Sequence, residues 1–296
     1  MTVRRLALAA ISAVGLLPFI ACGSQSDAKT DTGGERIVSL TDGLTESLFA
    51  LGLGDQVVGR DISSTLQEAS ELPIVTNDHE VNPEAVLAVR PTIILADEDT
   101  GPETALDQLR EIGIRIEIVP KAVTMDGIIT RLRAVAEVFD VEDRAQRLAD
   151  RIEADLASIS DLPDQGVRVA FLYLRGPAGV YLIGGPGSGP DSVIEAAGGT
   201  DAGTAIGLSA AFTPLTPEAI VEAAPDVILV TTTGYDSVSG LDGVLDLAGM
   251  GQTPAGRNRR IITAEDGLLF SFGPRTPELV RNLHDEIARL MTDTGS

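Results

Sequence analysis

A tyrosine and an arginine two positions apart are the first side chains in this sequence that could do chemistry. Tyr173 and Arg175 end an apolar stretch that we expect to be a β-strand, and alternate residues of a strand point to the same face. A neighbouring guanidinium favours the phenolate form of tyrosine, and phenolate oxygen suits hard ferric iron. Only two histidines are present, and His79 lies in a polar turn before a proline-initiated helix. Iron binding is therefore a hypothesis.

Each of these residues also has a plainer interpretation. A histidine in a polar turn is usually solvated, and the Tyr173 ring could simply pack in a cleft. Tyr181 and Tyr235 are rival candidates, because Tyr235 also follows an expected strand. His284 lies among charged residues of an expected terminal helix, so we place it at the surface.

The composition narrows the class of protein. The 296 residues include 22 basic and 44 acidic side chains, and a net charge of -22 repels nucleic acid. A hydrophobic fraction of 44% supports a packed core, whereas 3% aromatics and no Trp argue against a base-stacking platform. The single cysteine excludes an internal disulfide framework. Neither a Gly-x-Ser-x-Gly nor a His-Glu-x-x-His motif occurs, so we expect no enzyme, although an exported α/β enzyme remains an alternative.

The N-terminus is typical of an export signal. Arg4 and Arg5 precede an apolar run that ends at Ala21, which predicts a signal peptide over residues 1–21. Ala21 before Cys22 resembles a lipobox, in which the cysteine becomes the acylated first residue of a bacterial lipoprotein. The polar residues 22–35 suit a flexible tether. We expect an exported protein with a lipid anchor in the cell membrane, and an ordinary secretory signal is the alternative.

Beyond residue 35, short apolar strands alternate with helical stretches, a pattern that indicates parallel α/β sheets. The pattern predicts an N-terminal lobe over residues 36–123 and a C-terminal lobe over 163–296. Between them, apolar residues recur at helical spacing over 124–162, with a possible break at 140–143. We expect a long linking helix there.

An internal repeat supports two similar lobes. Residues 82–95 and 216–229 both contain an N-cap, a proline, an apolar helix, a second proline and an apolar strand. Glu84 and Glu218 occupy equivalent positions in the two copies.

Four segments of the sequence resemble a known family. Residues 36–40, 44–52, 57–59 and 82–95 are similar to the substrate-binding lipoproteins of ABC importers for iron-siderophores, cobalamin and heme. The resemblance covers nearly all of the chain after the export signal. It implies two Rossmann-like α/β lobes joined by a long α-helix, with a ligand in the cleft between them. The fold alone does not identify which ligand the protein binds.

The heme-binding branch of this family shares the Tyr-x-Arg spacing. In that branch a His from one lobe and a Tyr from the other hold the heme iron, which implies His79 and Tyr173 as axial ligands. Arg175 would then serve either the phenolate or a heme propionate. A ferric siderophore or cobalamin is the alternative ligand, although the chain is poor in the aromatic residues that cobalamin clefts use.

Other residues are predicted from the same resemblance. Gly184 and Gly185 would let the backbone approach the porphyrin edge, and Tyr235 would also face the cleft. Each lobe of such a protein docks an exposed acidic residue onto the permease, which works with its ATPase. Glu46 and Glu218 match these positions best, although both could simply be first-turn glutamates that complement a helix dipole. We expect a monomer.

Overall fold

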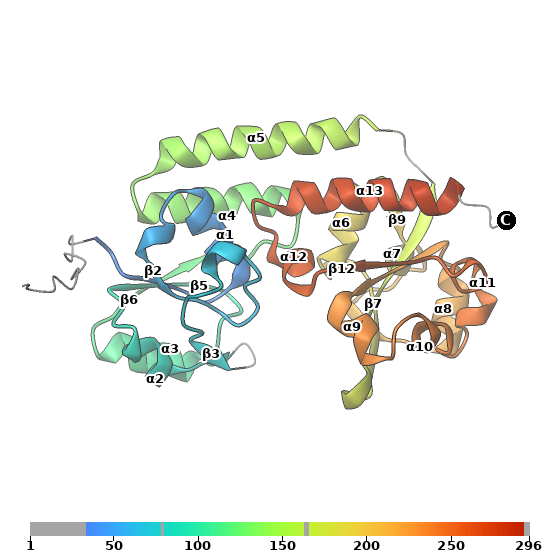
Figure 1. The fold of residues 1–296 in the computed structure, drawn as a ribbon, viewed down its shortest axis with the longest axis horizontal. Coiled ribbons are helices and arrows are strands. Elements are labelled where there is room, and N and C mark those ends of the chain that lie inside the picture. Colours follow the sequence, from blue (N-terminus) through green and yellow to red (C-terminus); the bar gives the residue numbers. More distant parts are fainter. Residues whose placement is uncertain (1–33, 78–79, 163–165, 293–296) are drawn as a thin grey trace, which may run out of the picture. The chain divides into compact units, whose positions relative to one another are not determined.

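The computed structural model of the chain describes residues 34–77, 80–162 and 166–292. The predicted signal peptide, Cys22 and nearly all of the tether lie outside these residues. Residues 35–296 belong to one compact unit, in which two α/β lobes lie side by side beneath long helices (Figure 1). The predicted two-lobed α/β architecture is confirmed.

The N-terminal lobe is built on a four-stranded sheet of order β2-β1-β5-β6, in which every pairing is parallel. The central strands β1 and β5 are buried along their whole length, as expected when helices cover both faces. Strands β3 and β4 form a separate antiparallel pair. The elements of this lobe are β1 (Ile37–Ser39), α1 (Asp42–Ala50), β2 (Val57–Gly59), β3 (Thr76–Asn77), β4 (Glu80–Val81), α2 (Pro83–Ala88), β5 (Ile93–Asp97), α3 (Glu103–Glu111) and β6 (Arg115–Val119).

The C-terminal lobe has a six-stranded mixed sheet of order β10-β8-β7-β11-β12, with β9 also paired to β7. Strands β7, β9, β11 and β12 run parallel, whereas β8 pairs antiparallel with β7, and β10 pairs antiparallel with β8. The strands are β7 (Val167–Arg175), β8 (Val180–Gly184), β9 (Gly199–Asp201), β10 (Phe212–Pro214), β11 (Val227–Thr231) and β12 (Ile261–Ala264). The helices are α6 (Pro190–Ala196), α7 (Ala202–Ala205), α8 (Pro217–Ala223), α9 (Thr232–Ser237), α10 (Leu241–Leu245), α11 (Pro254–Asn258), α12 (Asp266–Ser271) and α13 (Thr276–Thr292).

The segment predicted over 124–162 as a linking helix with a possible break at 140–143 forms two helices, and the second begins within that break, at Glu142. Helix α4 (Met125–Val138) and helix α5 (Glu142–Ser160) pack against each other, and Asp140 between them has a left-handed backbone with φ of 53°. Aspartate adopts this conformation more readily than most residues, so it suits the chain reversal. Helix α5 then crosses from one lobe to the other, above α13 (Figure 1).

One continuous apolar core joins the lobes. Leu48 of α1, Leu132 of α4 and Ile152 of α5 belong to the same buried cluster as Val193 of α6 and Ile287 of α13. Because separating the lobes would expose this cluster to water, the hydrophobic effect holds the two lobes together.

The internal repeat is reproduced in the structure. Asn82 accepts a hydrogen bond from the N–H three residues on, and so does Thr216 in the second copy. Each helix is followed by a left-handed residue before proline, Arg90 with φ of 47° and Ala224 with φ of 41°. The two lobes therefore share a local design as well as a sheet.

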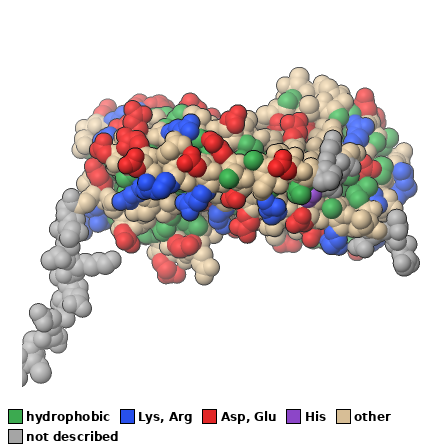
Figure 2. Space-filling view, turned by 90° about the horizontal axis from the view of Figure 1, so that it is seen from above, with side chains coloured by type: hydrophobic (Ala, Val, Ile, Leu, Met, Phe, Trp, Pro, Cys, Tyr) green, Lys and Arg blue, Asp and Glu red, His purple; other side chains and the backbone are tan. Residues whose placement is uncertain are grey.

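The charged side chains of both signs are scattered over the face that α5 and α13 cover, without a separate acidic patch (Figure 2). Among the described helices, none combines the length and apolar composition needed to cross a bilayer.

Candidate ligand-binding site

A cavity of about 710 Å³ lies between the two lobes, a size within the roughly 300–1,000 Å³ typical of small-molecule sites. It lies beyond the carboxyl ends of parallel strands in both sheets, where α/β folds bind ligands. The predicted cleft is therefore confirmed. Its lining residues are Thr41, Asp42, Gly43, Ile62, Ser63, Thr65, Asp97, Lys121, Ala122 and Arg131 on the N-terminal side, and Tyr173, Arg175, Leu182, Phe212, Thr233, Asp266, Gly267, Phe270 and Ser271 on the C-terminal side.

On the C-terminal side, Tyr173 and Arg175 project from the end of β7 into the cavity, as their spacing predicts. The guanidinium carbon of Arg175 lies 4.3 Å from the centroid of the Tyr173 ring. The Tyr173 ring also makes edge-on contacts with Phe212 and Phe270, at centroid distances of 6.0 and 6.5 Å. These rings form an apolar wall suited to a flat ligand. We call Tyr173, Phe212 and Phe270 the aromatic wall.

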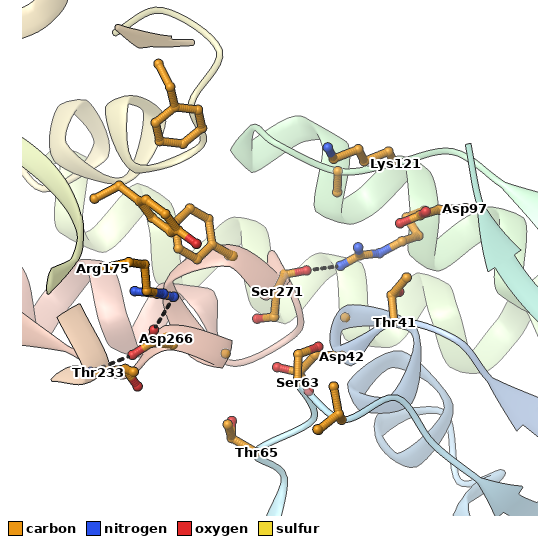
Figure 3. A pocket seen from close by; sticks show the side chains of 18 of the residues that line it. Thr41, Asp42, Ser63, Thr65, Asp97, Lys121, Arg175, Thr233, Asp266 and Ser271 are labelled. Atoms are coloured by element: carbon orange, nitrogen blue, oxygen red, sulfur yellow. Dashed lines mark hydrogen bonds and ion pairs between the residues drawn. The ribbon is translucent and has the colours of Figure 1, made fainter. Parts of the chain in front are cut away.

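Arg175 is held in place by its own lobe. Its Nη2 lies 3.2 Å from Oδ1 of Asp266, and its Nη1 donates to the Leu174 carbonyl at 2.9 Å. The other oxygen of Asp266 accepts a hydrogen bond from the Thr233 N–H at 3.0 Å (Figure 3). The arrangement fixes the guanidinium beside the phenol and leaves it partly exposed to the cavity.

On the N-terminal side, Asp42 is a buried carboxyl group at the start of α1, 4% exposed, and it lines the cavity (Figure 3). Neither of its oxygens has a hydrogen bond of regular geometry with the described residues. Burial and then the charge of Glu46 raise its pKa from 3.8 to about 7. The hydroxyl of Ser64, the charge of Arg275 and the backbone of Thr65 oppose that rise in pKa. The group is therefore partly protonated at neutral pH.

Arg131 of α4 is a second buried charge, 3% exposed, that also lines the cavity. Its Nη2 donates to the carbonyl of Ser271 at 2.7 Å and to that of Phe272, both in the C-terminal lobe. Burial lowers its pKa to about 10, against the opposing charges of Asp97, Glu46 and Asp42. Arg131 stays charged at neutral pH and connects the lobes. We call Asp42 and Arg131 the polar floor.

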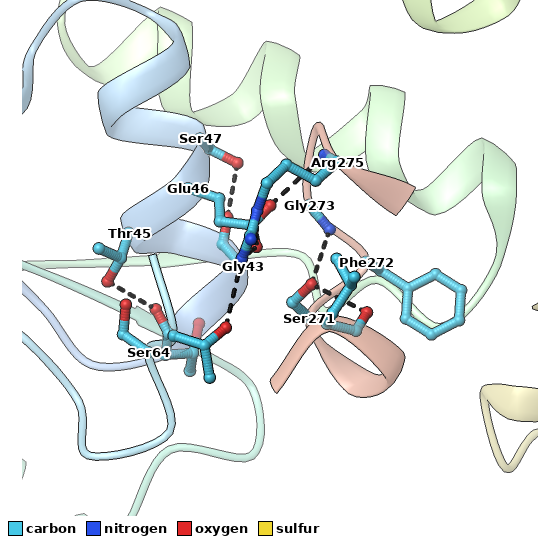
Figure 4. A network of polar contacts seen from close by, with 12 residues as sticks. Gly43, Thr45, Glu46, Ser47, Ser64, Ser271, Phe272, Gly273 and Arg275 are labelled. Atoms are coloured by element: carbon cyan, nitrogen blue, oxygen red, sulfur yellow. Dashed lines mark hydrogen bonds and ion pairs between the residues drawn. The ribbon is translucent and has the colours of Figure 1, made fainter. Parts of the chain in front are cut away.

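Glu46 is buried, 2% exposed, which corrects the prediction that it is an exposed docking residue. Its Oε1 accepts hydrogen bonds from Nη2 and Nε of Arg275, at 2.5 and 3.0 Å (Figure 4). A Cβ added to Gly273 would lie 2.1 Å from Oε2 of Glu46, so glycine is required for this close approach. Glu46 ties α1 to the segment before α13 and faces away from solvent. Glu218, in contrast, is exposed in the first turn of α8.

Gly184 and Gly185 do not line the cavity, which corrects the prediction that they approach a ligand. A Cβ on Gly185 would lie 2.8 Å from a backbone oxygen of the neighbouring segment, so glycine is needed there for packing. Two later amides of this loop, those of Gly187 and Gly189, donate to the carboxylate of Asp191 at 2.7 and 2.8 Å. The anion that this loop holds is a side chain of its own helix.

The two faces of the C-terminal sheet separate the three tyrosines. Tyr173 packs with the cluster on one face of the C-terminal sheet, whereas Tyr181 and Tyr235 pack with the cluster on the other. Neither Tyr181 nor Tyr235 lines the cavity, which corrects the prediction for Tyr235. His284 is also buried, 8% exposed, and its Nδ1 lies 3.0 Å from the carbonyl of Ala197, contrary to its expected surface position.

His79 lies outside the described residues. The strand before it is tied to the rim of the cavity, because the hydroxyl of Thr76 donates to Asp61 at 2.7 Å and accepts from the Ile62 N–H at 3.0 Å. Ile62 itself lines the cavity. The chain therefore approaches the site from the N-terminal lobe three residues before His79.

The polar floor was not predicted from the sequence, although two signals in the sequence pointed to it. Thr41 and Asp42 follow the first strand of the N-terminal lobe, just as Arg175 ends the first strand of the other lobe. Arg131 lies on the apolar face of α4, three residues after Ile128 and four before Val135, where a charge is unexpected.

Two α/β lobes joined through helices, with a cavity lined from both, define a two-lobed solute-binding protein. Residues 37–267 match the periplasmic binding protein family, and the chain belongs to that family. It is a binding protein rather than an enzyme.

Three comparisons illustrate the relationship. The apo structure of the periplasmic heme-binding protein RhuT from Roseiflexus sp. RS-1 is 38% identical, with a TM-score of 0.83, over 87% of this chain and 99% of that chain. The ABC transporter substrate-binding lipoprotein YvrC of Bacillus subtilis is 27% identical over 271 residues, 89% of this chain and 83% of that protein. A vitamin B12-binding protein of Vibrio campbellii is 25% identical over 176 residues, 59% of this chain and 63% of that protein.

Proposed function

We propose that the cavity binds ferric heme outside the cytoplasm and that the protein delivers it to an ABC permease and its ATPase. The observation that carries this proposal is the Tyr173 phenol, the only one among the three tyrosines to line the cavity, with Arg175 over its ring. A phenolate oxygen suits ferric iron, and tyrosine is a known protein ligand of heme iron.

We propose His79 as the second axial ligand, contributed from the N-terminal lobe. The anchoring of Thr76 at the cavity rim supports this assignment, since it brings the chain close to the site. With an imidazole on one face and a phenolate on the other, heme iron has no open position for oxygen chemistry. Such a site carries heme without using it. Arg175 remains a candidate partner for either the phenolate or a propionate.

The test is a titration with hemin followed by absorption. The protein should develop an intense, red-shifted Soret band, and changing both His79 and Tyr173 to Ala should abolish tight binding. The control is a double variant in which both His284 and Tyr235 are changed to Phe, because neither residue lines the cavity. An unaltered spectrum and affinity in the His79/Tyr173 variant would eliminate this ligation scheme.

Cobalamin is the second candidate cargo. The similarity to a vitamin B12-binding protein favours it, and so does the polar floor, since the unpaired oxygens of Asp42 could accept hydrogen bonds from amide groups. Competition between hemin, cyanocobalamin and a ferric siderophore for the wild-type protein separates these cargoes. Displacement of hemin by a lower concentration of cyanocobalamin would reverse the order of the two candidates.

We propose that Glu84 and Glu218 dock the two lobes onto the permease. Both are exposed, and they occupy equivalent first-turn positions of the repeated helices α2 and α8, one in each lobe. Changing both residues to Lys should reduce delivery to a reconstituted permease while hemin affinity stays unchanged. Glu222→Lys, also on the exposed face of α8, is the control. If both variants deliver hemin equally well, Glu84 and Glu218 do not dock the permease and serve only to complement their helix dipoles.

We also propose that residues 1–21 are removed as a signal peptide and that Cys22 carries a lipid anchor, with a monomeric protein held at the membrane. Metabolic labelling with a radioactive fatty acid should label the wild-type protein but not Cys22→Ser. An unlabelled wild type would point to an ordinary secretory signal, and a labelled Cys22→Ser variant would place the lipid on a residue other than Cys22.

A further inference from the structure

The charges that line the cavity leave one acid without a counter-ion. Asp266 pairs with Arg175, and the charge of Asp97 acts on Arg131. The third basic group of the lining, Lys121, pairs with Asp99, which lies outside the lining. Ionised Asp42 therefore adds an uncompensated negative charge to the lining, whereas neutral Asp42 does not. The charged lining residues are Lys121, Arg131, Arg175, Asp42, Asp97 and Asp266.

The groups packed around Asp42 do not supply a dedicated counter-ion. Glu46, on the same helix, repels the ionised form. The guanidinium of Arg275, from the segment before α13, already makes two hydrogen bonds to Glu46. Arg131, from α4, gives its Nη2 to backbone carbonyls of the C-terminal lobe. The segment 64–65 offers only a hydroxyl and a backbone amide.

We propose that neutral Asp42 is the subsite for a carboxylate of the ligand, to which it donates a hydrogen bond, so that an acidic ligand enters together with a proton. This inference rests on the proposed function, because heme carries carboxylates on its edge. The proton comes from solvent and returns there on release, and no covalent bond in the ligand changes. Asp42 is then a specificity residue that favours ligands with carboxylates on their edge over ligands with amides there.

The physical reason is the sign of the charge. A ligand carboxylate near ionised Asp42 would place two anions side by side in a buried site, and the charge of Arg275 only partly offsets the cost of ionising Asp42 there. Protonation removes the repulsion and creates a donor for the incoming oxygen. An amide N–H would instead favour ionised Asp42 as an acceptor. The two ligand chemistries therefore predict opposite dependences of affinity on pH.

The experiment compares hemin binding by the wild type, Asp42→Asn and Asp126→Asn between pH 6 and 8.5. Asp126 is the control, because it is also a first-turn aspartate but is exposed, in α4. Calorimetry in buffers with different ionisation enthalpies gives the protons taken up on binding. We expect the wild type and Asp126→Asn to take up more protons than Asp42→Asn near pH 7 to 8. Above pH 7, the hemin affinity of the wild type and of Asp126→Asn, divided by that of Asp42→Asn, should fall by up to about tenfold per pH unit.

Hemin, Tyr173 and His79 exchange the same protons in every variant, so these protons cancel when the proton uptake of two variants is subtracted. Equal proton uptake and equal pH dependence in the wild type and Asp42→Asn would overturn the inference while leaving heme binding intact. Absence of hemin binding by the wild type at every pH would instead overturn the proposed function. Asp42→Ser, a smaller neutral residue, repeats the test if the Asn variant does not fold.

Cyanocobalamin, whose edge carries amides, supplies the second arm. We expect no Asp42-dependent proton uptake with it. An affinity for cyanocobalamin that rises with pH only when Asp42 is present, with no such effect for hemin, would overturn the carboxylate assignment in favour of amide recognition.

Discussion

The aromatic wall and the polar floor face each other across the cavity but are built in different ways. The wall is a local product of the C-terminal lobe, in which Tyr173 and Arg175 follow from the alternation of a single strand. The floor depends on both lobes, because Arg131 binds carbonyl oxygens of the segment that follows β12. The aromatic wall therefore needs only one sheet to form a surface for a flat ligand. The buried charges of the polar floor serve both the binding site and the connection between the lobes.

The largest expected effect is on that connection. Glu46→Ala leaves Arg275 without its partner and should lower the free energy of unfolding by about 3 kcal/mol, less than for a fully buried pair because Arg275 is about one-third exposed. Urea denaturation measures the change. The control is Glu84→Ala, on the surface of the same lobe. If the two variants lose equal stability, the ion pair does not hold the junction.

The second effect concerns the Asp42 carboxyl group. Its pKa is higher in the folded protein, about 7, than its ordinary value of 3.8, so the folded state retains a proton that the unfolded state has lost. The free energy of unfolding therefore falls as pH rises from about 4 to 7 and is level above that range. Asp42→Asn cannot ionise and should be more stable than the wild type by roughly 2 kcal/mol at pH 8, which is about half of what the whole pKa difference would give because the buried amide hydrogens also need partners.

At pH 4, where the carboxyl group is neutral in the fold, the Asp42→Asn variant should show little or no advantage. Thermal unfolding of both proteins across this range provides the measurement. An advantage that is independent of pH would show that burial does not perturb Asp42.

The smallest effect concerns the aromatic wall. Phe212→Leu removes edge-on contacts with Tyr173 and Phe171, at 6.0 and 6.4 Å, and should weaken hemin binding by about 1 kcal/mol, roughly fivefold. Phe139→Leu, beyond the end of α4 and away from the cavity, should bind hemin like the wild type. Equal affinities for the two variants would mean that the wall does not contact the ligand.

The sequence allowed the repeated architecture to be predicted, because its signals are local. The N-cap and proline of 82–95 and 216–229 mark the same helix and strand in each lobe, and the structure has both. Tyr173 and Arg175 were also predictable on one face, since strand alternation fixes side-chain direction.

Contacts between distant segments were not predictable in the same way. The partner of Glu46 lies 229 residues away, so its position near the start of a predicted helix suggested exposure where the fold buries it. Gly184 and Gly185 are required by packing within the lobe rather than by a ligand. Asp140 was recognised as a possible break, but the chain reversal into two helices depends on their packing against each other.

The central claim is that the Tyr173 phenol holds the iron of the cargo. The most direct measurement is the hemin affinity and absorption spectrum of Tyr173→Phe, with Tyr235→Phe as the matched control. We predict that Tyr173→Phe loses the iron–phenolate absorption and binds hemin roughly 100-fold more weakly, while Tyr235→Phe matches the wild type. Wild-type affinity and an unchanged spectrum in Tyr173→Phe would contradict the claim.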